Sequence, residues 1–361
     1  MRSHFWDVVV RGFLPIRDPV LKGDLFEKIP LTGSRNEIFN YLNQNKVDLT
    51  AFVNNEEDCE RLFRMYSYAA SAFIHSQSEP PTNVLPKEIA VPLVKFSQIL
   101  DRKPILSYGS YCLNNWQRID VTKPVELGNI RLLTHFCPIP YNRDEAWFIL
   151  VHVDIENSAA LGIFACHSML LQDPLTPEFA FFVLNQIKTS LINMNKALNR
   201  MPEECSPEHY FLFVRPYIFS FENVVYEDCF HGKPQTFRGE TGAQSSIIPA
   251  FLAALEIKHK DSMLTHHLQE MRDYMPKDHR IFLNNLENSS VHLREVAKKD
   301  SKLKPLYNEC LMQLIDFREK HFEYAINYIA NKVENPKGTG GTPYVPWLKQ
   351  LKEETKQQIL E

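Results

Sequence analysis

The sequence lacks the features that nucleic-acid binding, a metal ribbon or a disulfide framework would require. Its 40 Lys and Arg are outnumbered by 44 Asp and Glu, and no basic stripe is present. Because phosphate backbones are bound by clustered cations, we expect no nucleic-acid partner. The seven cysteines are odd in number and form no CxxC pair. This pattern excludes a zinc ribbon and favours reduced thiols in the cytoplasm.

Long apolar runs and common catalytic motifs are also missing. No run approaches the roughly 20 apolar residues that cross a bilayer. The N-terminal stretch "MRSHFWDVVVRGFLPIRDP" is broken by charged residues, unlike a signal peptide. We therefore expect a soluble, cytoplasmic protein with no membrane partner. No GxSxG, HExxH, DxDxDG or Rossmann motif occurs, so none of those enzyme classes is indicated.

What the sequence does contain is helical periodicity. The chain has 361 residues, 44% of them hydrophobic, which is enough for two domains or one large one. Residues 1–34 resemble an irregular arm, and residues 121–142 lose the helical period and mark a possible domain junction. We predict a mainly α protein. The predicted helices are 58–75, 83–100 (interrupted by two prolines), 104–119, 144–171, 176–201, 207–221 (ended or kinked at Pro216), 245–257, 262–275, 277–287, 290–299, 304–333 and 347–360.

Two histidines lie within apolar helical patterns. His152 is part of "WFILVHVDIE" (147–156) and shares a helical face with Phe148. His321 lies on an apolar stripe in "DFREKHFEYAINYI" (316–329). Each could be a core histidine with a hydrogen-bond partner, which is the commoner case. Alternatively, His152 faces a buried ligand and His321 is an axial ligand of haem iron, since neutral imidazole binds iron well.

Three further features could belong to a binding site. Arg215 lies in an aromatic segment, and a buried arginine needs a carboxylate, from the protein or from a ligand. The turn "FRGETGAQSS" (237–246) opens onto a helix whose amides could bind an anion, or it is an ordinary start capped by Ser245 or Ser246. The glycine-rich "GTGGT" (338–342) is either a flexible linker or a lid over a site.

Taken together and in order, several segments resemble the indoleamine 2,3-dioxygenase family. The resemblance runs from about residue 85 to the end of the chain and is weaker before that. It is carried by "KPILSYGSYCLNNW" (103–116), "DEAWFILVHVDIE" (144–156), "YFLFVR" (210–215), "FRGETGAQSS" (237–246), "MRDYMPKDHRIFLNNLE" (271–287), "FREKHFEYAINYI" (317–329) and "KGTGGTPYVPWLK" (337–349). It implies a small helical domain, here residues 1–139, and a large helical domain that binds haem b, residues 140–361.

The resemblance also implies roles for individual residues. His321 is similar to the proximal iron ligand, and Arg318 to the arginine that pairs with a haem propionate. Arg215 resembles the residue that holds the substrate carboxylate, a role suited to a guanidinium. The turn from Gly239 to Gly242 resembles the segment that passes over haem and substrate, and Thr339 the lid residue. The residues implied around the substrate are Tyr108, Phe148, Tyr210, Phe211, Gly239, Thr241, Gly242 and Thr339.

The sequence departs from the family pattern at three of these places. His152 stands where animal indoleamine enzymes usually carry a small hydroxyl residue, and so resembles the distal histidine of tryptophan 2,3-dioxygenases. Tyr210 replaces a phenylalanine, and Glu240 stands where the family often has glycine. We expect His152 to hydrogen-bond the indole nitrogen and position the ring.

The resemblance implies a haem dioxygenase of the kynurenine pathway. It would use dioxygen and an unidentified reductant, and it would cleave the indole C2–C3 bond of L-tryptophan or a related indoleamine to give N-formylkynurenine. Two alternatives remain open. One is a haem monooxygenase or hydroxylase that acts on a related indole or aromatic amino acid. The other is a non-catalytic haem-binding protein, in which a carboxylate clamp at Arg215 would have no purpose.

Overall fold

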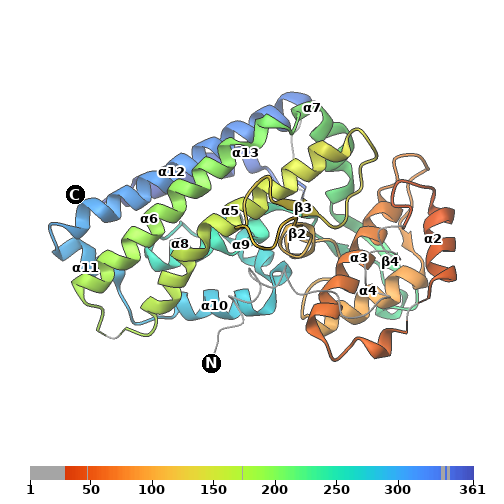
Figure 1. Ribbon diagram of the computed structural model, residues 1–361, viewed down its shortest axis with the longest axis horizontal. Helices are drawn as coiled ribbons and strands as arrows, with labels where there is room; N and C mark the ends of the chain where they lie inside the picture. Colours follow the sequence, from red (N-terminus) through yellow and green to blue (C-terminus); the bar gives the residue numbers. More distant parts are fainter. Residues whose placement is uncertain (1–28, 47, 173, 335–337, 340–341) are drawn as a thin grey trace.

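The computed structural model describes residues 29–361, apart from 47, 173, 335–337 and 340–341. The described chain is mainly α-helical, which confirms the predicted fold class. Three long helices run side by side through the larger part of the molecule (Figure 1): α5 (Asn142–Met169), α6 (Pro177–Asn199) and α12 (Leu303–Tyr328). The predicted arm, residues 1–34, lies almost wholly outside the described residues.

A smaller helical group lies at one end of the molecule (Figure 1). It contains α2 (Arg35–Gln44), α3 (Glu56–Ile74) and α4 (Lys87–Ile99). Its buried side chains pack into one hydrophobic cluster with residues that follow position 139, such as Leu150 on α5. A second cluster fills the space between α5, α6 and α12. The boundary between residues 139 and 140 stays a prediction.

Five short strands join these helical groups, and the sequence pattern did not predict them. They form a three-stranded sheet in the order β1-β4-β5 and a separate antiparallel pair, β2 with β3. The strands are β1 (Val84–Leu85), β2 (Trp116–Arg118), β3 (Ile130–Leu132), β4 (Phe221–Tyr226) and β5 (Gln235–Phe237). Because strands this short carry little periodicity, partners distant in sequence decide their pairing.

Three predicted helices need correction. The helix predicted at 83–100 begins at Lys87, because residues 84–85 pair with β4 and Pro86 occupies the N-cap position; Pro92 does lie inside it. The helix predicted at 104–119 is wrong, since it contains only a π-helical turn, Gly109–Leu113, before β2.

The third correction concerns residues 207–221. Here α7 (Pro207–His209) is followed by a π-helical turn (Tyr210–Val214) and a 3₁₀ turn (Arg215–Ile218) that contains Pro216. Proline lacks the amide hydrogen that a regular helix needs. The segment therefore changes helical type as it approaches β4.

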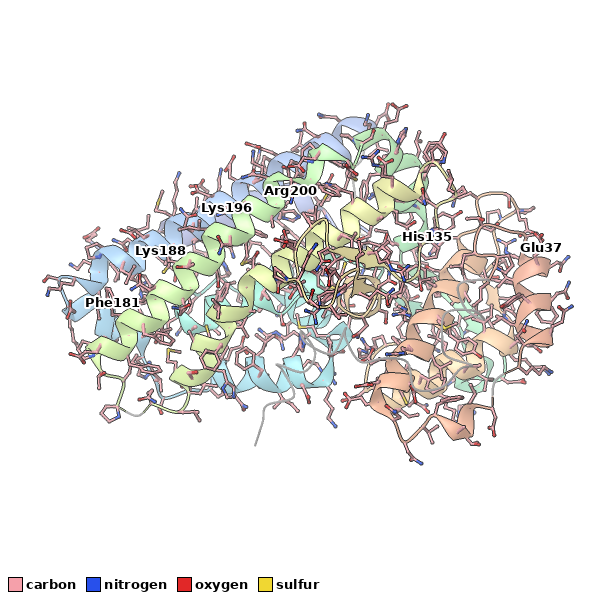
Figure 2. All side chains as sticks on the ribbon, viewed as in Figure 1. Glu37, His135, Phe181, Lys188, Lys196 and Arg200 are labelled. Carbon is pink, nitrogen blue, oxygen red and sulfur yellow. The ribbon has the colours of Figure 1, made fainter. Side chains whose placement is uncertain are left out.

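The remaining helices lie close to their predicted positions. They are α8 (Ile247–Ala254), α9 (Met263–Met271), α10 (Lys277–Glu287), α11 (Leu293–Lys299) and α13 (Tyr344–Lys356). Ser246 takes the N-cap position of α8, but its side chain makes no capping bond. On α6, the outer side chains Lys188, Lys196 and Arg200 point away from the core (Figure 2), and Lys188 pairs with Glu309 of α12 at 3.0 Å.

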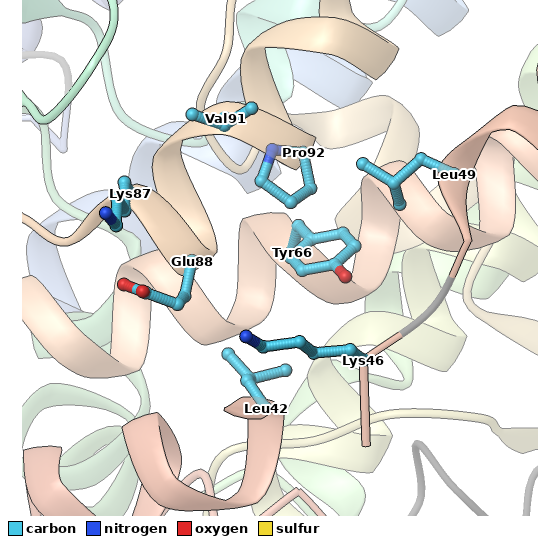
Figure 3. Close-up of a pocket in the computed structure, with 8 residues that line it drawn as sticks. All are labelled: Leu42, Lys46, Leu49, Tyr66, Lys87, Glu88, Val91 and Pro92. Carbon is cyan, nitrogen blue, oxygen red and sulfur yellow. The ribbon is translucent and has the colours of Figure 1, made fainter. Parts of the chain in front are cut away.

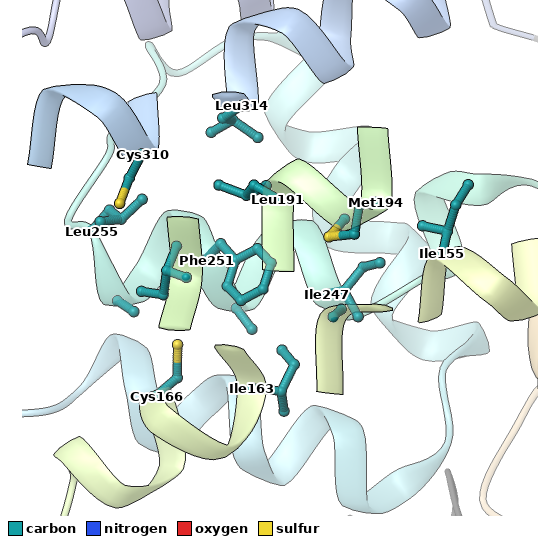
Figure 4. Packing of buried hydrophobic residues seen from close by; sticks show 14 of the residues in the cluster. Ile155, Ile163, Cys166, Leu191, Met194, Ile247, Phe251, Leu255, Cys310 and Leu314 are labelled. Atoms are coloured by element: carbon teal, nitrogen blue, oxygen red, sulfur yellow. The ribbon is translucent and has the colours of Figure 1, made fainter. Parts of the chain in front are cut away.

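The core between the long helices is tightly packed. Phe251 of α8 is fully buried among side chains of α5, α6 and α12 (Figure 4). Gly162 of α5 lets it approach, because a Cβ atom there would lie 2.8 Å from Phe251 Cζ. Among described helices, α5 alone has the length and apolar composition to span a membrane. However, 56% of that window is buried inside the fold, as in the core helix of many soluble proteins.

Candidate functional site

The structure brings the two predicted histidines, His152 on α5 and His321 on α12, to one site. The His321 side chain is exposed, yet desolvation by the surrounding protein, with a smaller effect from the charge of His152, lowers its pKa to about 4. Its imidazole is held neutral, which is the form that binds iron. His321 could therefore hold the iron of a haem group.

The His152 ring has one nitrogen occupied and one available. Nδ1 lies 2.7 Å from the carbonyl oxygen of Phe148. A carbonyl only accepts, so Nδ1 carries the hydrogen and Nε2 holds the lone pair. Burial lowers the pKa of His152, which keeps this neutral form at neutral pH. No described residue hydrogen-bonds Nε2, so this atom can accept an N–H from a ligand.

Aromatic rings surround His152. Phe148 lies 4.6 Å from it between ring centroids, and Tyr108 meets it edge-on at 6.1 Å. Tyr210 packs on the other side of Phe148, also at 4.6 Å, and reaches Tyr328 of α12 at 5.8 Å. Offset and edge contacts of this kind suit the binding of a flat aromatic ligand. The structure therefore brings together four residues predicted from the sequence.

A buried carboxyl group, that of Glu156, accepts a hydrogen bond from Tyr108. Glu156, one helical turn after His152, accepts hydrogen bonds from the Tyr108 hydroxyl at 2.9 Å and the Ser245 hydroxyl at 2.6 Å. Burial raises the pKa of Glu156 to about 7. Sequence reasoning missed this residue. Its position four residues after His152, on the same helical face, was the available signal.

The predicted turn is fastened to the same site. Gln244 accepts from the Tyr108 amide and donates to the Gly239 carbonyl, both at 2.9 Å. A Cβ atom on Gly239 would lie 2.3 Å from the Ile218 carbonyl oxygen, so only glycine fits there. Thr241 caps the following 3₁₀ turn, which begins at Gly242, through a 3.3 Å bond to the Ala243 amide. The turn therefore lies against Tyr108 with little freedom to move.

Arg215 lies between two aromatic rings near this turn. Its guanidinium carbon is 5.7 Å from the centroid of Phe211 and 4.7 Å from that of Phe219. The side chain is only 6% exposed, and burial lowers the pKa of the guanidinium. The two rings hold the guanidinium in place through cation–π contacts.

Thr339, from the glycine-rich segment, contacts the turn directly. Its hydroxyl donates to the carbonyl oxygen of Glu240, and its own carbonyl accepts from the Ser220 amide at 3.2 Å and the Ser220 hydroxyl at 2.9 Å. The glycine-rich segment was predicted to be either a linker or a lid. Its residue Thr339 contacts the turn of the site through Glu240.

Arg318 makes contacts that the sequence did not suggest. It is buried, and its guanidinium donates to the Leu351 carbonyl and the Thr355 hydroxyl of α13. It also lies 3.2 Å from His259 Nε2. These contacts fix α13 to the helix that carries His321. The pairing of Arg318 with a haem propionate stays a prediction.

Two other features of the described chain lie apart from this site. No group of three His, Cys, Asp or Glu side chains that could hold a metal ion occurs among the described residues. A haem group brings its porphyrin ligands with it, so a single histidine such as His321 could hold its iron. A surface groove beside α2 and α4 includes Leu42, Tyr66 and Pro92 (Figure 3), but none of the predicted site residues lines it.

Comparison with known proteins decides which family this site belongs to. A sequence model of indoleamine 2,3-dioxygenase matches residues 12–337. The chain belongs to the indoleamine 2,3-dioxygenase family. This confirms the predicted resemblance and, with it, the class of enzyme: a haem-dependent oxidoreductase of the dioxygenase type.

Relatives of this indoleamine 2,3-dioxygenase family member come from distant organisms. Indoleamine 2,3-dioxygenase 1 of Rattus norvegicus is 31% identical over 324 residues, which cover 81% of this chain and 78% of the relative. Indoleamine 2,3-dioxygenase of Saccharomyces cerevisiae is 29% identical over 360 residues, covering 84% and 79%. A protein named myoglobin, from Haliotis madaka, is 28% identical over 292 residues, covering 75% and 73%. The chain is thus similar to proteins that are named for different activities.

Proposed function

We propose that the protein cleaves the indole C2–C3 bond of L-tryptophan, or of a related indoleamine, to give N-formylkynurenine. One observation carries the proposal. The neutral His321 imidazole is available for iron, and His152, close enough for its charge to affect His321, offers a free Nε2 acceptor. When bound through His321, haem b supplies the iron that binds and activates dioxygen.

The protein's own residues would bind and orient the substrate. The indole would pack against Phe148, Tyr108 and the neighbouring rings, with its N–H donated to His152 Nε2. The Arg215 guanidinium would hold the substrate carboxylate. Two fixed points and a flat stacking surface place the indole in one orientation, and such positioning lowers the barrier without any proton transfer by the protein. His152 is then a hydrogen-bond acceptor and need not be a general base.

A second candidate is a haem protein that binds oxygen or another small ligand without turnover. The relative named myoglobin supports it, since it covers three quarters of this chain. The resemblance of Arg215 to the family's carboxylate-binding arginine argues for the enzyme, because a gas ligand has no carboxylate to bind.

The test is a product assay with labelled dioxygen. Ferrous, haem-loaded protein is mixed with L-tryptophan and ¹⁸O₂, and the product is analysed by mass spectrometry. We expect N-formylkynurenine with both added oxygen atoms labelled. A single label would indicate a monooxygenase instead. A normal haem spectrum without any product would favour the second candidate, and failure to take up haem would contradict the role of His321.

We also propose a cytoplasmic location, an unidentified reductant, and no nucleic-acid or membrane partner. All seven cysteines are free thiols, as expected in a reducing compartment. Fractionation of cells that express the protein tests the location, and recovery in the membrane or secreted fraction would contradict it.

A further inference from the structure

The Tyr108 side chain contacts α5 at two points that are one helical turn apart. Its ring meets the His152 ring edge-on, with 6.1 Å between the ring centroids. Its hydroxyl donates a hydrogen bond to Glu156 Oε1 at 2.9 Å. Residues four apart in sequence lie on the same face of a helix. The buried Tyr108 side chain therefore lies along the face of α5 that carries His152.

The main chain and the side chain of Tyr108 are held by different partners. The Tyr108 amide donates to Gln244 Oε1 at 2.9 Å, which fixes the backbone to the turn. The Tyr108 hydroxyl has no hydrogen-bond partner other than Glu156 among the described residues. Without this bond, packing against neighbouring side chains would be the only restraint on the ring. The orientation of the Tyr108 ring against His152 therefore depends in part on Glu156.

A carboxyl group is an unfavourable choice for position 156 unless its oxygens are used. Glu156 is only 7% exposed, and its neighbours on α5, Ile155 and Ala159, are buried and apolar. Burying a carboxyl group costs free energy unless its oxygens take part in hydrogen bonds. Oε1 accepts two, from the Tyr108 hydroxyl and from the Ser245 hydroxyl at 2.6 Å. An apolar side chain would fill the same space but leave both hydroxyls unpaired, so these bonds are what the carboxyl group contributes.

The two contacts of Tyr108 with α5 connect Glu156 to the binding of substrate. We propose that Glu156 is a positioning residue: it holds the Tyr108 ring against His152, so that the two rings form one wall of the space that receives the indole. Glu156 acts through Tyr108 and does not itself touch the substrate. The inference rests on the proposed function for the identity of the ligand. A wall that is fixed before binding reduces the entropy lost when a flat ligand is oriented.

The test measures the affinity of the haem-loaded protein for L-tryptophan from the shift of the haem absorption band, which does not depend on turnover. Glu156→Gln keeps an acceptor oxygen in the same place and should bind tryptophan as tightly as the wild type. Glu156→Leu keeps the approximate size but removes the acceptor, and should weaken binding about 10-fold. Tyr108→Phe removes the donor at the other end of the bond and should weaken binding by a similar factor.

A double variant shows whether Glu156 acts through Tyr108. If it does, Glu156→Leu has nothing further to remove once the Tyr108 hydroxyl is gone. The protein that carries both Glu156→Leu and Tyr108→Phe should then bind tryptophan like either single variant. Losses of affinity that multiply in the double variant would mean two independent effects and would overturn the proposal.

Two controls separate positioning from a general loss of structure. Tyr226→Phe removes the hydroxyl of another fully buried tyrosine, one that donates to the Pro104 carbonyl at 2.8 Å. It should lower the free energy of unfolding without changing the affinity for tryptophan. Cyanide needs only the haem iron, so it should bind every variant as it binds the wild type. Cyanide affinity that falls in parallel with tryptophan affinity would indicate a damaged haem site and overturn the proposal.

The outcomes also distinguish this proposal from the proposed reaction. Tryptophan binding that is unchanged in Tyr108→Phe would overturn the positioning role, even if Glu156→Leu fails to fold. Selective weakening of tryptophan binding in the variants, without any oxygenated product from the wild type, would support the positioning role and contradict the proposed reaction. A wild type that binds haem but not tryptophan would contradict both.

Discussion

Replacing Glu156 with glutamine should stabilise the protein at alkaline pH. Both hydrogen bonds to Glu156, from Tyr108 and Ser245, end on the same oxygen, Oε1. A glutamine carbonyl can accept both in the same geometry, so the substitution removes only the charge. Burial raises the pKa of Glu156 from 4.5 to about 7, so the folded state favours the protonated form.

The sign and size of the effect follow from linkage. When folding raises the pKa of a carboxyl group, the protein loses stability as the pH rises from the pKa in the unfolded state to the pKa in the folded state. For Glu156 these values are 4.5 and about 7. A shift of this size corresponds to about 3 kcal/mol in total, of which about 2 kcal/mol falls between pH 5.5 and 8.5. Glutamine does not titrate, so Glu156→Gln should avoid this loss.

The assay is denaturant unfolding of both proteins at pH 5.5, 7 and 8.5. The variant's advantage over the wild type should grow by about 2 kcal/mol across this range. Glu222→Gln, with an exposed side chain, should follow the wild type at every pH. If the difference in unfolding free energy between Glu156→Gln and the wild type stays constant with pH, the reasoning is refuted. Such a result would show that folding does not raise the pKa of Glu156.

Three further predictions concern the site and its supports. His152→Ala removes the acceptor for the indole N–H and should lower kcat/KM for tryptophan by about 10–100-fold; unchanged steady-state kinetics would contradict that role. Thr355→Val removes an acceptor of the buried Arg318 guanidinium and should cost about 1–3 kcal/mol in unfolding experiments, whereas a variant as stable as the wild type would show that the contact is dispensable. Gly162→Ala should cost about 1–3 kcal/mol, because its Cβ would lie 2.8 Å from Phe251 Cζ. A melting temperature equal to that of the wild type would mean that the ring moves aside without cost.

The long helices and the two histidines were predictable because they depend on local pattern. The apolar period of α5 and α12 predicts both helices, and with them the positions of His152 and His321, from neighbouring residues alone. The strand pair that replaced the predicted helix at 104–119 was not predictable in this way, since Trp116 pairs with Leu132 across a loop. Local propensity gave no sign of that distant partner.

Sequence patterns could not predict the side-chain contacts of the site that join residues distant in the chain. Arg318 was expected to pair with a propionate, which stays a prediction, but its contacts with His259 and with α13, more than 30 residues further along, were not foreseen. Glu156 was missed because a carboxylate within an apolar helix shows its purpose only when Tyr108 and Ser245 are seen beside it.

The C-terminal segment contacts two parts of the site. Thr339 is bonded to the turn at Glu240, while α13 is bonded to Arg318, one helical turn before His321. At the far end, Asn308 of α12 bonds both the amide and the carbonyl of Leu360 at 2.9 Å. Because the segment from Thr339 to Leu360 is bonded to the rest of the protein at both ends and in between, its length is constrained during evolution. Insertions and deletions among relatives should therefore be selected against between Thr342 and Leu360.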